Sequence, residues 1–197
     1  AACVLFPRLM TGQALPSSAE YSWASDLLDV GLPLRVFGGQ TMRAGRMPLW
    51  YPGCYGGVPL AAIPEAAPYY PPSALFYILF DPVRATAWSL GLHLIFAGLG
   101  TALLARRLGA GFAGQILSGL AASLGLWLPN HFRQMHLLQS AAWAPWAWLA
   151  LEGWIARASW RNAARLGLAM GGLTLAGHLQ VLHQTILLLG IWMVFRL

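Results

Sequence analysis

The sequence predicts an all-α integral membrane protein, a polytopic bundle of about five or six transmembrane helices forming one membrane domain over residues 1–197. Composition is the first reason: 58% of the residues are hydrophobic, only 9% are charged, and the mean hydropathy is +0.58. A soluble domain averages roughly a quarter charged residues, so this chain has too few charges to cover a water-facing surface. The second reason is a succession of long apolar stretches from residue 85 onward.

The chain opens on the apolar run AACVLF. That run is too short to cross a bilayer, because a spanning helix needs about 20 residues. We interpret residues 1–7 as the end of a first transmembrane helix that is truncated upstream. Residues 8–84 hold most of the polar residues and most of the prolines. They predict a large loop outside the membrane that carries interfacial helices.

Within this loop, residues 33–45 (PLRVFGGQTMRAG) project as a helix with Pro33 at its favoured first position. At about 100° per residue, Arg35, Arg43 and Arg46 fall on one face, and apolar or small residues fall on the other. Such an amphipathic helix suits the membrane interface. Two interpretations of its arginines stay open: contact with lipid headgroups, or a bidentate grip on a phosphate group.

The next segment, MPLWYPGCYGGVPLAAIPEAAPYYPP at residues 47–72, has too many prolines and glycines for a helix. It is also too apolar for an ordinary solvent loop. We interpret it as irregular backbone at the outer membrane interface, where its aromatic side chains suit the depth of the headgroups. We expect it to roof a site between two interfacial helices.

Residues 85–197 predict the transmembrane bundle. The predicted spans are residues 85–104, 112–128 and 137–154. Pro145 predicts a kink in the last of them. Residues 166–197 are too long for one upright helix and short for two. Their polar break, GHLQVLHQ at residues 177–184, favours two short helices meeting in a tight turn, with a single long, tilted helix as the alternative.

Arginines in the short loops predict the orientation. Two connections expected on the same side carry five of them, namely Arg106, Arg107, Arg157, Arg161 and Arg165. The loop between these connections, residues 130–136, carries only Arg133. Because positive loops stay in the cytoplasm, we expect residues 8–84 to be extracytoplasmic. Membrane topology therefore accounts for the net charge of +6, and we expect no nucleic-acid partner.

Five sequence segments follow one another in a recognisable order. They are SDLLDVGLPLRVF at residues 25–37, RMPLWYPGCYGGVPLAAIPEAAPYYPP at 46–72, LHLIFAGLGTALLARRLG at 92–109, MHLLQSAAWAPWAWLALE at 135–152 and LAGHLQ at 175–180. This series resembles the YfhO family of bacterial polytopic membrane proteins, which belongs to the GT-C glycosyltransferase superfamily. The resemblance extends over nearly the whole chain, as the amino-terminal part of such a protein, and implies the bacterial cytoplasmic membrane.

The resemblance implies a glycosyltransferase that passes a sugar from a polyprenyl-phosphate carrier to an extracytoplasmic acceptor. By its position in the motif, Asp26 matches the catalytic carboxylate, which would take the proton of the acceptor hydroxyl. Asp29 would serve as a second carboxylate or as a metal ligand, and a divalent cation is one way to stabilise the leaving phosphate. Capping of an interfacial helix is the alternative role for both aspartates. The expected substrate-binding residues are Asp29, Arg35, Arg43, Glu65, Tyr70, His136 and His178.

The sequence also departs from the family pattern. Tyr51 and Ile63 stand where asparagine is common, and Leu179 stands where proline is usual. GT-C enzymes generally have more membrane helices than this chain can hold. These departures support a second hypothesis, a non-catalytic structural subunit derived from this family. In that case the partners would be membrane lipids and the other subunits of a larger membrane complex.

Two ionisable residues fall in the predicted spans. His93 lies mid-span beside small residues, and we expect a hydrogen-bonded packing histidine, with ligation of a haem or chlorin metal as the alternative. Glu152 lies at the cytoplasmic end of its predicted helix. We expect it to pair with Arg157 or with an interfacial group.

Overall fold

The fold is taken from a computed structural model of the chain, which describes residues 7–11, 26–125 and 127–196. The predicted end of a first transmembrane helix lies outside these residues except for Pro7, which begins the short helix α2 (Pro7–Met10). The described elements are all helical, and the β pairing among them is one isolated antiparallel bridge between Tyr51 and Val58. The all-α prediction is confirmed for this part of the chain.

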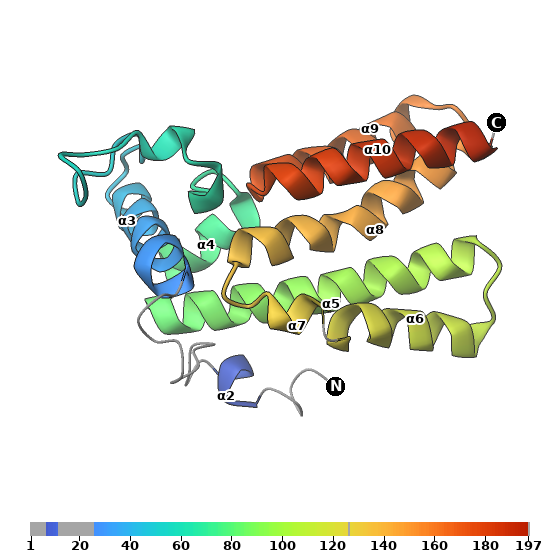
Figure 1. The fold of residues 1–197 in the computed structure, drawn as a ribbon, viewed down its shortest axis with the longest axis horizontal. Coiled ribbons are helices and arrows are strands. Elements are labelled where there is room, and N and C mark those ends of the chain that lie inside the picture. The colour runs from blue at the N-terminus through green and yellow to red at the C-terminus, as the bar shows by residue number, and fades with distance from the viewer. Residues whose placement is uncertain (1–6, 12–25, 126, 197) are drawn as a thin grey trace.

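The bundle is built around two central helices, α5 (Pro82–Arg107) and α8 (Met135–Ala156), which pack on each other. Its other members are α6 (Phe112–Leu124), α7 (Trp127–Asn130), α9 (Trp160–Leu175) and α10 (Leu179–Arg196). Helix α6 packs on α5, whereas α9 and α10 pack on α8 (Figure 1). Gly98 and Gly119 meet where α5 and α6 touch, and a Cβ on either would lie 2.9 Å from the carbonyl oxygen of the other. Glycine at both positions therefore permits the close approach.

Within the described residues, three helical stretches are long and apolar enough to cross a membrane, judged by length and composition. They are Pro82–Arg107, Phe112–Asn130 and Leu179–Arg196. The first two contain the predicted spans 85–104 and 112–128. The predicted span 137–154 forms α8, which continues through Pro145 but is not one of the three stretches. The larger number of about five or six crossings stays a prediction.

The C-terminal region folds as two helices, α9 and α10, separated by residues 176–178. The prediction of two helices with a tight turn is confirmed, and the alternative of one long, tilted helix is wrong. Gly177 has a φ of +92°, and a Cβ there would collide with the carbonyl oxygen of Pro64. The turn therefore requires glycine both for its left-handed backbone and for its contact with the loop. The residues LQVLHQ are helical and do not belong to the break.

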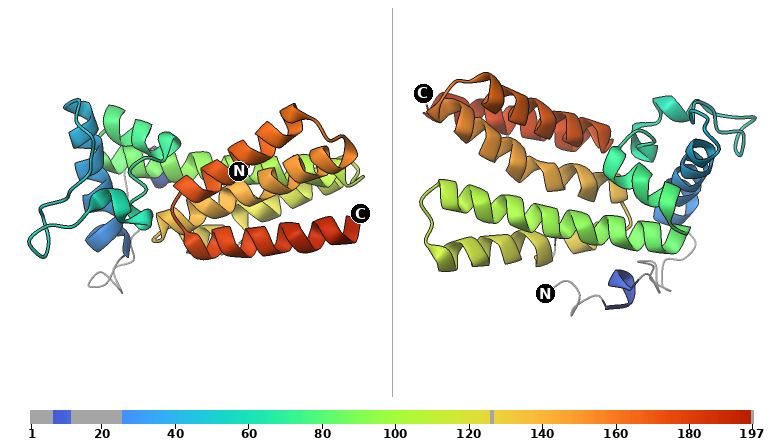
Figure 2. Two further views of the ribbon diagram at one scale, coloured as in Figure 1. Left: turned by 90° about the horizontal axis from the view of Figure 1, so that it is seen from above. Right: turned by 180° about the vertical axis from the view of Figure 1, so that it is seen from behind.

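A smaller helical region lies at one end of the bundle (Figures 1 and 2). It contains the π-helical turn η2 (Asp26–Gly31), α3 (Leu32–Arg43) and α4 (Pro71–Leu79). The segment between α3 and α4 has only two short 3₁₀ turns, η3 (Leu60–Ala62) and η4 (Pro64–Ala66). The predicted helix at 33–45 and the predicted irregular segment at 47–72 are confirmed, except that the final two prolines of that segment begin α4.

The two arginine-bearing connections lie at the far end of the bundle from α3 (Figure 1). Arg106 and Arg107 precede the α5–α6 connection, and Arg157 lies in the α8–α9 connection. The α7–α8 connection and the α9–α10 turn lie at the α3 end. The two arginine-bearing connections therefore share one end of the bundle, as predicted, while the side of a membrane on which that end lies stays a prediction.

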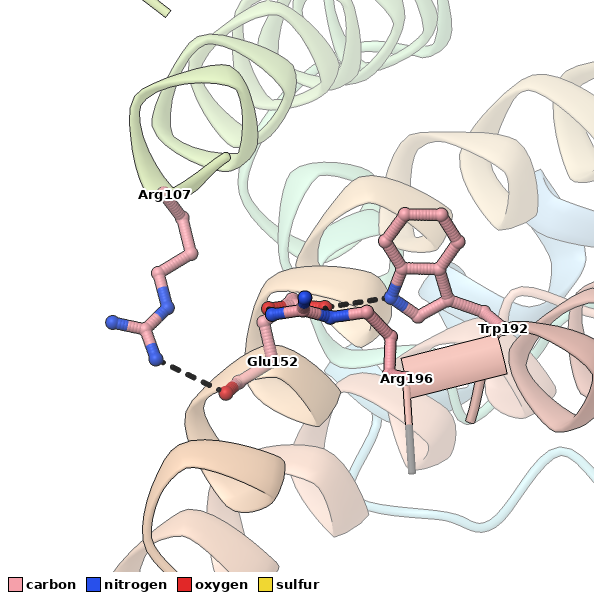
Figure 3. Close-up of polar contacts among 4 residues, drawn as sticks. All are labelled: Arg107, Glu152, Trp192 and Arg196. Carbon is pink, nitrogen blue, oxygen red and sulfur yellow. Dashed lines mark hydrogen bonds and ion pairs between the residues drawn. The ribbon is translucent and has the colours of Figure 1, made fainter. Parts of the chain in front are cut away.

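Glu152 forms the main ion pair of the arginine-rich end (Figure 3). Its carboxylate accepts hydrogen bonds from Arg196 Nε at 3.0 Å, from Arg196 Nη2 at 3.1 Å and from Trp192 Nε1 at 2.6 Å. Arg107 Nη2 donates to the backbone oxygen of Glu152 at 3.2 Å. The predicted pairing with Arg157 is wrong, because α10 packs along α8 and brings Arg196 to the carboxylate instead.

Candidate functional site

A pocket of about 320 Å³ opens where three segments that are distant in the sequence meet. The segments are the η4 turn of the loop, the first turn of α8 and the turn between α9 and α10. The lining residues are Pro64, Glu65, His136, Gly177, His178, Leu179 and Gln180. Three of the predicted substrate-binding residues, Glu65, His136 and His178, therefore share one pocket. Gln180 was not among the predicted residues, although it lies in the LAGHLQ segment.

The two histidines stack against each other in this pocket. The ring centroids of His136 and His178 lie 5.1 Å apart, with 16° between the ring planes. The Nδ1 atom of His178 accepts a hydrogen bond from the backbone N–H of Val181 at 3.1 Å. The backbone N–H of His178 donates to Ser140 Oγ at 3.1 Å. Because Nδ1 acts as an acceptor, the neutral His178 ring carries its proton on Nε2 and has a donor for a ligand.

Both histidines are biased towards the neutral form. Burial, helped by the charges of Arg35 and His178 and opposed by that of Asp26, lowers the pKa of His136 to about 4. Burial also lowers the pKa of His178, against the raising effect of Glu65. Neutral imidazoles donate and accept hydrogen bonds without adding charge, which suits the recognition of hydroxyl groups.

Asp26 and Asp29 lie in the η2 turn that leads into α3. Asp26 Oδ2 accepts a hydrogen bond from Gln134 Nε2 at 3.3 Å. Asp26 does not line the pocket, but its charge acts on His136, as the pKa of that ring shows. The N-cap of α3 is Gly31, without a side-chain hydrogen bond. Neither aspartate therefore caps α3 itself, but η2 begins at Asp26 and runs directly into α3, so capping of that first turn stays a prediction.

Arg35 is buried beneath the loop, with 5% of its surface exposed. Its Nη1 donates to Ser73 Oγ at 2.8 Å, and its Nη2 donates to the backbone oxygen of Glu65 at 3.2 Å. Burial lowers the pKa of the guanidinium. The headgroup interpretation is wrong for Arg35, because α4 and the loop cover its face of α3, and Arg35, predicted as a substrate-binding residue, does not line the pocket either. Arg43, by contrast, is exposed, donates to the backbone oxygen of Ile78 and does not line the pocket.

Tyr70 is 1% exposed and does not line the pocket. Trp143 Nε1 donates to its hydroxyl at 2.7 Å, and the hydroxyl lies 2.6 Å from His93 Nε2. His93 Nδ1 lies 2.5 Å from the backbone oxygen of Ser89. A carbonyl oxygen only accepts, so Nδ1 donates and Nε2 accepts from Tyr70. Both ring nitrogens of His93 are thus engaged, in agreement with a hydrogen-bonded packing residue.

A buried side chain of α8, Gln139, connects Arg35 to the bundle through hydrogen bonds. Gln139 Nε2 donates to Ser73 Oγ at 3.3 Å and to Ser89 Oγ at 2.9 Å. Gln139 Oε1 is buried and has no hydrogen-bond partner among the residues that the structure describes. Neither Gln139 nor the two serines were among the predicted residues. A signal was present for Gln139, since a polar residue within a predicted span faces protein more often than lipid.

The described part of the chain holds no group of three or more His, Cys, Asp or Glu residues arranged to bind a metal ion. Comparison of this chain with protein-family models, with curated proteins and with solved structures found no match.

Proposed function

We propose that this chain is a GT-C-like membrane glycosyltransferase, or the amino-terminal part of one. In this proposal it transfers a sugar from a polyprenyl-phosphate carrier to an acceptor outside the bacterial cytoplasmic membrane. The observation that carries the proposal is the pocket lined by Glu65, His136 and His178. The predicted base, Asp26, lies at the same end of the molecule and acts electrostatically on His136.

The residues suit the chemistry of such a transfer. The acceptor hydroxyl oxygen forms a bond to the anomeric carbon, while the bond from that carbon to the phosphate oxygen breaks. The hydroxyl proton passes to the carboxylate of Asp26, and the polyprenyl phosphate leaves with the bonding electron pair. Glu65 and the Nε2–H of His178 would hold sugar hydroxyl groups. Arg35 would fix the loop backbone at Glu65 through its hydrogen bond to that residue.

The test uses the full chain purified into lipid vesicles. A panel of polyprenyl-phosphate sugars with a radiolabelled sugar is added, and consumption of each donor is followed. Asp26→Asn, Glu65→Gln and His178→Gln are compared with the parent chain. We expect Asp26→Asn to lower the rate at least 100-fold, as removal of a general base typically does. The two pocket variants should instead raise KM.

Asp81→Asn is the matched control. Asp81 is exposed, caps α5 through the backbone N–H of Arg84 and lies outside the pocket. The Asp81→Asn variant should leave the rate of sugar transfer unchanged. Full activity in Asp26→Asn would remove the assignment of the base. Consumption of no donor by the parent chain would remove the enzymatic proposal altogether.

A second candidate function is a non-catalytic subunit of a larger membrane complex. The observation in its favour is the surface of α10, where only Val181, Thr185 and Leu189 are buried. The other faces of α10 expose Ile186, Leu187, Leu188, Ile191, Val194 and Phe195. Such a helix can contact either lipid or another subunit. Purification from the native membrane in mild detergent tests this function, because a subunit elutes with defined partners in fixed stoichiometry.

A further inference from the structure

A second and larger cavity, a groove of about 660 Å³, lies at the arginine-rich end of the bundle. It runs along α8 and is bordered by the end of α5 and the first half of α9. Its walls are mainly apolar and include Trp143, Trp146, Leu149, Ala150, Leu168 and Ala169. None of the residues predicted from the sequence as site residues lines it.

The two tryptophans present apolar surface to the groove because their polar atoms are already engaged. Trp143 Nε1 donates to the Tyr70 hydroxyl, and Trp146 Nε1 donates to the backbone oxygen of Phe96 at 3.0 Å. Glycine makes room for both indoles, since a Cβ at Gly172 or at Gly100 would collide with them. The wall of the groove is therefore a packed apolar surface suited to a hydrocarbon chain.

Three arginines, Arg107, Arg157 and Arg165, line the same groove. All three are exposed, and the lining contains no carboxylate within the described part of the chain. The nearby acid, Glu152, is committed to Arg196 and Trp192, and Arg107 reaches only its backbone oxygen (Figure 3). The ion pairs of the described residues involve none of the three groove arginines. The three guanidinium groups thus make no ion pair within the described residues, although the charge of Arg107 also acts on Glu152.

The length of the groove matches one leaflet of a bilayer. The stretch of α8 from Trp143 to Ala156 rises about 20 Å at 1.5 Å per residue. Half of a bilayer, with its headgroups, is about 20–22 Å thick. A lipid whose chains lie against the tryptophans thus has its phosphate at the level of the arginines. A free phosphate ion would leave the apolar wall unused.

We propose that this groove binds one anionic phospholipid, with its acyl chains along Trp143 and Trp146 and its phosphate at Arg107, Arg157 and Arg165. The side chain of Asn162, which also lines the groove, orients the site. Its Nδ2 donates to the backbone oxygens of Gly153 and Arg157, and its Oδ1 accepts from Arg165 Nη1 at 3.1 Å. These bonds join the start of α9 to the end of α8. The site is independent of the proposed enzymatic activity.

The experiment measures lipid binding by native mass spectrometry of the full chain in detergent. The probes are phosphatidylglycerol, phosphatidylcholine and inorganic phosphate. We expect one phosphatidylglycerol to be retained, with at least tenfold preference over phosphatidylcholine. In Arg157→Gln/Arg165→Gln the apparent Kd should rise roughly 20-fold, at about fivefold for each arginine near a phosphate. Ala150→Phe, which fills the groove without changing the charge, should also abolish retention.

Arg106→Gln/Arg161→Gln is the matched control. It removes the same charge from the same end of the bundle, but neither residue lines the groove. We expect this control to retain the lipid like the parent chain. Equal losses in the two double variants would overturn the proposal in favour of general surface attraction. Equal retention of phosphatidylcholine, or phosphate binding as tight as that of the lipid, would also overturn it. Circular dichroism of each variant verifies that the helices are intact.

Discussion

Ser73→Ala is the sharpest test of how the loop is held over the bundle. Ser73 is 1% exposed, and its hydroxyl accepts hydrogen bonds from Arg35 and from Gln139. Removing the hydroxyl leaves Arg35 Nη1 buried without that acceptor, whereas Gln139 keeps its bond to Ser89. A hydrogen bond to a charged group contributes about 1.5–3 kcal/mol. We therefore expect the free energy of unfolding to fall by about 2–3 kcal/mol.

The assay is thermal unfolding of the purified chain in detergent, followed by circular dichroism. For a chain of this length, 1 kcal/mol corresponds to about 2–4 °C, so the midpoint should fall by about 4–12 °C. Ser118→Ala is the control, because Ser118 Oγ donates only to the backbone oxygen of Gln115 within α6. That variant should shift the midpoint by less than about 2 °C, as surface substitutions usually do.

A second variant separates the cause from a simple packing defect. If the unpartnered guanidinium is the source of the loss, Arg35→Met should suppress most of the effect of Ser73→Ala in a double-mutant cycle. Equal midpoints for Ser73→Ala and Ser118→Ala would refute the reasoning. So would additive losses in the Arg35→Met background, because they would show that the serine acts without the arginine.

Three further predictions concern other parts of the fold. Burial lowers the pKa of His136 to about 4, so the unfolded chain binds the proton of this ring more readily than the folded chain does. The free energy of unfolding should therefore fall as the pH decreases from 6.5 to 4. In unfolding experiments at a series of pH values, His136→Gln should flatten this decrease. Glu152→Gln should lower the free energy of unfolding, measured with a chemical denaturant, by about 1–2 kcal/mol. The loss is moderate because Glu152 is 2% exposed, whereas its partner Arg196 is 44% exposed and partly screened by solvent. Gly177→Ala should lower the thermal midpoint by several degrees, because of the positive φ and the collision with Pro64.

Each of these predictions has a contrary outcome. A pH profile with the same slope in the parent chain and in His136→Gln would assign the titration to another group, such as His178. A coupling energy of zero between Glu152→Gln and Arg196→Gln in a double-mutant cycle would mean that the ion pair contributes nothing. Wild-type stability in Gly177→Ala would show that the turn relaxes away from the loop. The matched control is Gly167→Ala, because a Cβ at Gly167 would meet open space.

Structural features that depend on residues close together in the sequence could be predicted from the sequence. The apolar runs at 85–104 and 112–128 indicated helices because hydropathy over a window of residues decides whether a segment can cross a bilayer. Proline and glycine density indicated the irregular path of residues 47–72 because these residues restrict or loosen φ locally. The loop arginines predicted which connections share an end of the bundle.

Partners brought together by packing could not be predicted in the same way. Helical periodicity placed Arg35 on the polar face of α3, yet α4 and the loop bury it. Glu152 was expected to pair with Arg157, the nearest basic residue in the chain, but α10 supplies Arg196. A helix face becomes exposed or buried only when another element covers it, and a single local pattern does not contain that information.

The pocket of Glu65, His136 and His178 illustrates the division. The sequence by itself determined that this is a helical, membrane-suited chain, and the family resemblance singled out the two histidines, with Glu65 added as an acidic residue of the loop. Only the tertiary structure decided that they line one pocket and that Arg43 and Tyr70 do not. The physical reason is that the pocket forms where the η4 turn, the start of α8 and the α9–α10 turn pack together. The close contact of Gly177 with Pro64 sets their spacing.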